Sequence, residues 1–121
     1  MDFSESRAIY LQITDMICEN ILTGEWAAGD RIPSVRDLAV DIQVNPNTVQ
    51  RAYTWLQDRD VIRTQRGVGY FITDEGYDIT LQLKKEEFIS ATCPRIARAM
   101  QLLQLDFADL KAILEKQEDD S

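Results

Sequence analysis

The apolar residues near the start of the chain recur with the spacing of a helix. From Ile9 to Ile21 an isoleucine stands at every fourth position, and this spacing places all of them on one face of an α-helix. Gly24 follows shortly after, and glycine often ends a helix because it adopts the left-handed backbone conformation without strain. We therefore predict an amphipathic helix over residues 9–22.

Two shorter helices with a tight turn between them are predicted next. An extended link over residues 31–33 precedes them, because the residue before a proline is pushed out of the α region. Ser34 is a suitable N-cap for the first helix, whose apolar face comprises Val35, Leu38, Ala39 and Ile42. Asn45 and Pro46 start the second, since asparagine caps well and proline favours the first helical position. Its predicted buried face comprises Val49, Ala52, Tyr53 and Leu56, and its opposite, polar face comprises Asn47, Gln50, Arg51 and Thr54.

A β-hairpin is predicted after the third helix. Residues 61–65 and 69–73 are rich in strand-forming side chains, and Arg66-Gly67-Val68 joins them with a glycine that can supply a positive φ. The order helix, helix, turn, helix, hairpin is that of a winged helix-turn-helix domain, whose third helix enters the major groove of DNA. We expect a mostly α-helical fold with a small β wing, in which residues 1–76 form a DNA-binding domain.

The remaining residues, 77–121, predict a short C-terminal tail of two helical pieces. The pieces divide near Leu105, with Asp106 as the N-cap of the second, and Pro94 must kink or split the first because an interior proline costs on the order of 3 kcal/mol. We expect the apolar residues of this tail to form a homodimer interface, since such a large patch is rarely left exposed. The alternative is that the tail folds back and completes the core of the domain. The predicted dimerisation residues are Phe88, Ile89, Ile96, Met100, Leu103, Phe107, Leu110 and Leu114.

The distribution of charge adds a local signal to this pattern. The chain of 121 residues carries 13 Lys and Arg against 21 Asp and Glu, a net charge of −8, which has the wrong sign for binding nucleic acid through bulk charge. Residues 44–70, however, hold four arginines against two aspartates. This net-positive stretch coincides with the predicted third helix and hairpin, and arginine is suited to contacts with phosphate and guanine.

Several classes of function are excluded by what the sequence lacks. It has no histidine, which removes the usual catalytic triads and imidazole metal sites. Cys18 and Cys93 have no metal-ligand or disulfide-framework spacing, and no glycine loop with a lysine could hold phosphates. We therefore expect no enzyme, no cofactor and no metal. Without a signal peptide or an apolar run of roughly 18 residues, we also expect a cytoplasmic protein that does not contact the membrane.

Residues 8–73 resemble the winged DNA-binding domain of GntR-type transcription factors. The resemblance rests on the stretch from Gly29 to Pro33, the start of the following helix from Ser34 to Ala39, and the glycine-rich wing. The segment VNPNTVQRAY, residues 44–53, together with the short helical tail, is similar to the YtrA-like subfamily. This resemblance implies a bacterial dimeric regulator, usually a repressor, that binds an inverted-repeat operator and dimerises through its C-terminal helices.

The resemblance also implies roles for individual residues. Arg36 corresponds to a contact with the DNA backbone, and Asn47, Thr48 and Gln50 stand where family members touch phosphates or base edges. Pro46 occupies a position where many members have a DNA-contacting arginine, so the operator cannot be copied from them. The predicted DNA-binding residues are Arg31, Ser34, Arg36, Asn45, Asn47, Thr48, Gln50, Arg51, Arg66, Gly67 and Gly69.

Some alternatives remain open from the sequence. The polar face of the third helix is also what any solvated amphipathic helix shows, Gly67 and Gly69 could be turn residues only, and Tyr70 stands where a small threonine is commoner in the family. A winged helix can also act as an adaptor that binds protein without DNA, and the regulator could activate rather than repress. An unknown small-molecule effector could bind only at the junction of domain and tail or across the dimer.

Overall fold

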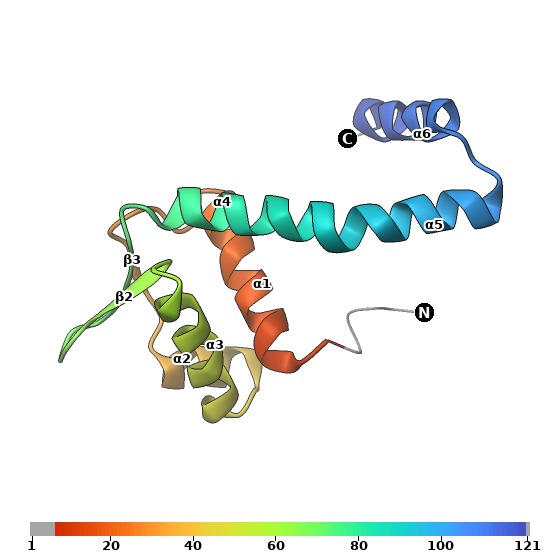
Figure 1. The fold of residues 1–121 in the computed structure, drawn as a ribbon. Helices are drawn as coiled ribbons and strands as arrows, with labels where there is room; N and C mark the ends of the chain where they lie inside the picture. The colour runs from red at the N-terminus through yellow and green to blue at the C-terminus, as the bar shows by residue number, and fades with distance from the viewer. Residues whose placement is uncertain (1–6, 121) are drawn as a thin grey trace. The chain divides into compact units, whose positions relative to one another are not determined.

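A computed structural model describes residues 7–120 (Figure 1). Their internal contacts divide the chain into two compact units between Leu83 and Lys84. The division lies inside helix α4, Gly76–Glu87, and not between residues 76 and 77, where the sequence suggested that the domain ends. The reason is packing: Ile79 and Leu83 lie against the hydrophobic core of the first unit, and Thr80 is buried. The first turns of α4 therefore belong to the first unit.

Besides the first turns of α4, the described part of the first unit contains three whole helices, at the positions that the periodicity predicted. They are α1 (Ile9–Leu22), α2 (Val35–Ile42) and α3 (Pro46–Asp58). The predicted apolar face of α3 is confirmed, because its four residues are completely buried. They pack in one core with Ile17 and Ile21 of α1 and Leu38 of α2. Burial of this face fixes which side of α3 remains on the surface.

The turn between α2 and α3 is held by local hydrogen bonds. Ser34 Oγ accepts a hydrogen bond from the Asp37 backbone N–H at 3.1 Å, which confirms it as the N-cap of α2. Gln43 ends α2 in the left-handed conformation, with φ 57°. Asn45 Oδ1 then accepts from the Asn47 backbone N–H at 2.8 Å and caps α3. These short-range interactions orient α3 against α2, as a helix-turn-helix requires.

The sheet contains the predicted hairpin and one strand more. β2 (Ile62–Gln65) and β3 (Gly69–Ile72) pair antiparallel, and β1 (Arg31–Ile32) joins the other edge of β3 in the order β1-β3-β2. Residues 31 and 32 were expected only as an extended link. A two-residue strand is too short to show alternation, and its pairing partner lies far along the chain. The mostly helical fold with a small β wing is confirmed.

The helical tail continues from α4 through two further elements to a separate last helix. A single π-helical turn, η2 (Phe88–Thr92), follows α4 directly, and α5 (Cys93–Leu103) follows η2. Pro94 lies in the first turn of α5. Its missing N–H and its ring are incompatible with an uninterrupted α-helix, so the predicted break takes the form of a π-helical turn that ends two residues before this proline.

The last helix, α6 (Phe107–Asp119), starts at the predicted cap. Asp106 Oδ1 accepts from the Asp109 backbone N–H at 2.8 Å, and Asp109 Oδ2 accepts from the Asp106 backbone N–H at 3.0 Å. This reciprocal pair is a capping box. No residue of α5 or α6 is buried. Over residues 7–120, the helices are all too short or too polar to cross a lipid bilayer.

Candidate nucleic-acid interface

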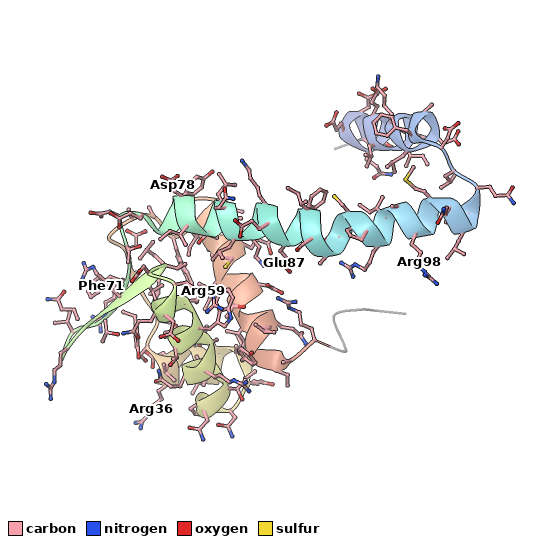
Figure 2. All side chains as sticks on the ribbon, in the orientation of Figure 1. Arg36, Arg59, Phe71, Asp78, Glu87 and Arg98 are labelled. Atoms are coloured by element: carbon pink, nitrogen blue, oxygen red, sulfur yellow. The ribbon has the colours of Figure 1, made fainter. Side chains whose placement is uncertain are left out.

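The candidate interface is centred on the polar face of α3. Asn47, Gln50, Arg51 and Thr54 are all exposed, whereas the opposite face of the same helix is completely buried. On the neighbouring helix α2, Arg36 points away from the core into solvent, as Figure 2 shows. The first unit therefore presents amide, hydroxyl and guanidinium groups from a rigidly packed helix, which is what reading the edges of bases requires.

Gln50 is held between α3 and the wing. Its Nε2 donates to Thr54 Oγ1 and to the Tyr70 hydroxyl, both at 3.4 Å. The Tyr70 ring packs edge-on against Tyr53, with centroids 4.9 Å apart and an interplanar angle of 80°. A polar side chain of α3 is thus connected to strand β3.

Tyr53 anchors this group to the interior. It is completely buried, and its hydroxyl donates to the backbone carbonyl of Pro33 at 2.6 Å. Burial, and to a lesser extent the neighbouring Tyr70, raises the pKa of Tyr53 well above its ordinary value of 10.0. The hydroxyl therefore stays protonated as a donor, and it ties α3 to the segment that leads into α2.

Arg51 is held by the first helix. Its guanidinium carbon lies 3.9 Å from the centroid of the Tyr10 ring, a cation–π stack between α3 and α1. Shallow hollows of about 440 and 380 Å³ flank this stack. Tyr10, Asn47 and Arg51 line both hollows. Because a stacked guanidinium keeps its N–H donors in its own plane, Arg51 can offer them to a ligand without leaving the ring.

The other arginines of the net-positive stretch differ in their surroundings. Arg59 stacks on Trp55 at 3.6 Å and donates to its backbone carbonyl, so it is held at the C-terminal end of α3. Arg63 lies 5.0 Å from the centroid of the Phe71 ring, its cross-strand neighbour. Arg66 is exposed in the turn between β2 and β3. In the charge pattern of the sequence these arginines were equivalent. In the structure most of them lie over an aromatic ring, whereas Arg66 is exposed at the tip of the wing.

The wing glycines both have a structural requirement. Gly67 has φ 77° and Gly69 has φ 146°, conformations that other residues rarely adopt. A Cβ atom at position 69 would also lie 2.8 Å from Nε of Arg31, whose side chain covers this position. The turn explains both glycines without DNA, and the exposure of Gly67 leaves the tip of the wing accessible.

All the predicted DNA-binding residues lie in the first unit and reach its surface. Thr48 and Gly69 are partly buried and the other predicted residues are exposed. The side chains of Ser34 and Asn45 are engaged as helix caps. Tyr10 and Tyr70 were not predicted as residues of the site, and the sequence marked Tyr70 only as a departure from the family. Their partners lie on other elements, so spacing within one element gave no signal.

The predicted dimerisation residues all lie in the second unit. Phe88 and Ile89 lie in η2, and the others are distributed over α5 and α6. Phe107 is 75% exposed, Ile89 and Leu103 are each 67% exposed, and Leu114 is 55% exposed. Ile96, Met100 and Leu110 are partly buried.

Comparisons with known proteins agree with this architecture. Residues 9–72 match the family model for bacterial regulatory proteins of the gntR family. The chain is 42% identical over 82 residues to the uncharacterized HTH-type transcriptional regulator YhcF of Bacillus subtilis strain 168, covering 68% of this chain and 67% of that protein. It is 43% identical over 74 residues to the HTH-type transcriptional repressor YtrA of the same strain, covering 61% of this chain and 57% of YtrA. A solved GntR family transcriptional regulator from Listeria monocytogenes superimposes with a TM-score of 0.78 at 35% identity, over 96% of this chain and 98% of that one.

Proposed function

Because this chain belongs to the GntR family and is a DNA-binding transcriptional regulator of the kind its YtrA and YhcF relatives represent, we propose that it is a homodimeric repressor. In this proposal the dimer binds an inverted-repeat operator and blocks access of RNA polymerase to the promoter. Its place of action is the bacterial cytoplasm, where the chromosome lies.

The observation that carries the proposal is the exposed polar face of α3, supported from behind by a completely buried apolar face. We assign base-edge contacts to Gln50, and phosphate contacts to Arg36 and Thr48. Arg51 adds a charged donor at the same face. Arg66 and Gly67 approach the DNA backbone from the tip of the wing. With a net charge of −8, the chain repels DNA at long range, so binding depends on these local contacts.

The homodimer is supported by the second unit. Large apolar side chains remain exposed there, Leu102 at 71% and Phe107 at 75% among them, and a two-fold interface is the commonest way to cover such a surface. A two-fold dimer would place two copies of α3 on half-sites about 34 Å apart, one turn of DNA. The repressor assignment is supported by the relative YtrA, which is named as a transcriptional repressor.

Selection from a random DNA library tests the proposal. The full chain is incubated with the library at low salt, retained fragments are sequenced, and the selection is repeated with Gln50→Ala and Arg51→Ala. We expect an enriched inverted repeat. Gln50→Ala should relax the base preference at one position of each half-site, and Arg51→Ala should weaken the binding to the repeat. Arg59→Ala is the matched control for Arg51, because it removes an equally charged and equally stacked arginine from the other end of α3. Gln82→Ala on α4 is the control for Gln50.

Three results would contradict parts of the proposal separately. If no sequence is enriched at low salt, where phosphate contacts are strongest, the DNA-binding role fails and the winged helix is better explained as an adaptor that binds protein. A single-copy mass of 13.9 kDa by light scattering, at the concentration that binds DNA, would rule out the homodimer. Increased transcription from the bound promoter would replace repression by activation.

A further inference from the structure

The side-chain nitrogen of Gln50 already faces two acceptors within the protein. A glutamine amide nitrogen carries two hydrogens, and its oxygen only accepts hydrogen bonds. Gln50 Nε2 has two acceptors at 3.4 Å, the hydroxyl of Thr54 one turn along α3 and the hydroxyl of Tyr70 on β3. Among the described residues, none donates a hydrogen bond to Gln50 Oε1. The free polar group of this exposed side chain is therefore its carbonyl oxygen.

Tyr70 is fixed from the interior and not by Gln50 alone. Its ring contacts the buried Tyr53, whose hydroxyl is bonded to the Pro33 carbonyl. Its backbone lies in the central strand of the sheet, opposite Ile32 on one side and Thr64 on the other. The hydroxyl that accepts from Gln50 therefore occupies a defined position, set by the packing of the wing on α3.

We infer that Tyr70 is a positioning residue that determines which bases Gln50 reads, by holding its amide so that the carbonyl oxygen faces the DNA. This inference rests on the proposed function. In the major groove a lone acceptor can bind only an exocyclic amino group, N6 of adenine or N4 of cytosine. The usual two-bond recognition of adenine by glutamine also requires an N–H that donates to N7, and here the amide nitrogen is turned toward two hydroxyl oxygens of the protein instead. Gln50 accordingly tolerates adenine or cytosine at one operator position.

Removal of the Tyr70 hydroxyl changes this preference in a defined direction. Tyr70→Phe keeps the ring contact with Tyr53 and releases one N–H of Gln50. The freed N–H can then donate to N7 of adenine while Oε1 accepts from N6. We expect the variant to prefer adenine over cytosine at the position where the wild-type protein accepts both.

Base analogues in the selected operator test this directly. The operator position at which Gln50→Ala loses its base preference is synthesised with three different bases. They are adenine, 7-deazaadenine, which lacks N7, and a purine without the 6-amino group. For the wild-type protein we expect a loss of roughly three- to tenfold in affinity without the amino group, the effect of one hydrogen bond, and no loss without N7. For Tyr70→Phe we expect a loss with either analogue. Thr54→Val, which removes the other acceptor, should create the same sensitivity to N7.

The controls separate this inference from structural damage and from the proposed function. Tyr77→Phe removes a hydroxyl from an exposed tyrosine of α4 and should leave the analogue profile unchanged. The inferred role of Tyr70 would be wrong if the wild-type protein lost affinity when N7 is absent. It would also be wrong if the wild-type protein, Tyr70→Phe and Thr54→Val showed the same loss of affinity with each analogue. Either result would leave the selected operator, and so the proposed function, intact. If no operator is selected at all, the proposed function fails first, and the inference about Gln50 fails with it.

Discussion

Stacking on aromatic rings restricts three of the arginines near the candidate interface. Arg51, Arg59 and Arg63 lie over the rings of Tyr10, Trp55 and Phe71, respectively. A stacked guanidinium retains its charge and its in-plane donors, and it has less rotamer freedom to lose when it binds a phosphate. For Arg51 the stack also connects α3 to α1. The affinity of this surface thus depends on how its charges are held as well as on their number.

The raised pKa of the single residue Tyr53 predicts that the stability of the protein depends on pH. Because burial raises its pKa above 10.0 in the folded protein, the unfolded chain loses this proton at a lower pH than the folded one. Its contribution to stability is therefore complete below the unfolded pKa and is lost as the pH rises above it. Tyr53→Phe should cost roughly 1–2 kcal/mol at neutral pH, since the Pro33 carbonyl loses its donor.

Denaturant unfolding at about pH 8 and at about pH 11 would measure both effects. We expect the free energy of unfolding to fall less between these values in Tyr53→Phe than in the wild-type protein. Tyr77→Phe, an exposed tyrosine, should behave as the wild type does. An equal fall in Tyr53→Phe and the wild type would show that Tyr53 does not titrate abnormally.

Among the elements, those specified by local signals were predictable from the sequence. The helices α1, α2 and α3, their caps at Ser34 and Asn45, and the cap of α6 at Asp106 depend on residues within one or two turns. Strand β1 was not predictable as a strand, because it exists only by pairing with β3. The π-helical turn before Pro94 was expected only as a kink or a break, since the sequence does not specify how a helix accommodates a proline.

The candidate site likewise has one part that the sequence predicts and one part that it does not. The polar face of α3 follows from helical spacing, so its members could be named from the sequence. The contacts that hold them could not, because Gln50 and Tyr70 are 20 residues apart and Arg51 and Tyr10 belong to different helices. Which side chains meet across elements depends on the packing of the whole unit.

The capping box of α6 yields a prediction at the scale of one helix. Asp106→Ala removes the acceptor for the Asp109 backbone N–H and should destabilise α6 by about 1 kcal/mol, the usual effect of losing an N-cap. The loss should be visible as reduced helicity by circular dichroism and as earlier melting of the tail. Asp106→Asn, which keeps an acceptor at the same place, should restore most of the signal; equal losses in both variants would exclude the cap as the cause.

For the whole molecule, the decisive prediction concerns the second unit. Phe107→Ser combined with Leu114→Ser makes the exposed apolar stripe of α6 polar. If this stripe contributes to the homodimer, the mass measured by light scattering should fall to that of one 13.9 kDa chain. Affinity for the full inverted repeat should fall by more than tenfold, because the two half-sites are then bound independently, while affinity for a single half-site stays unchanged.

Lys116→Ala provides the control, because helical spacing places this exposed residue on the opposite side of α6. It should leave both the mass and the operator affinity unaltered. If the wild-type protein is a dimer and the double serine variant keeps its mass, the contact does not depend on the stripe of α6. The exposed apolar residues of η2 and α5 would then be the next to test.

The contact with Arg31 and the backbone conformation at position 69 differ in their evolutionary consequence. The atoms that a side chain at position 69 would meet belong to the guanidinium end of a flexible, exposed arginine, which can swing aside. The positive φ of 146° at position 69, in contrast, strains any residue other than glycine. A change of the arginine at position 31 therefore does not by itself open position 69 to other residues. Across relatives, we expect glycine to be kept at position 69 of β3 even where the residue at position 31 of β1 is not arginine.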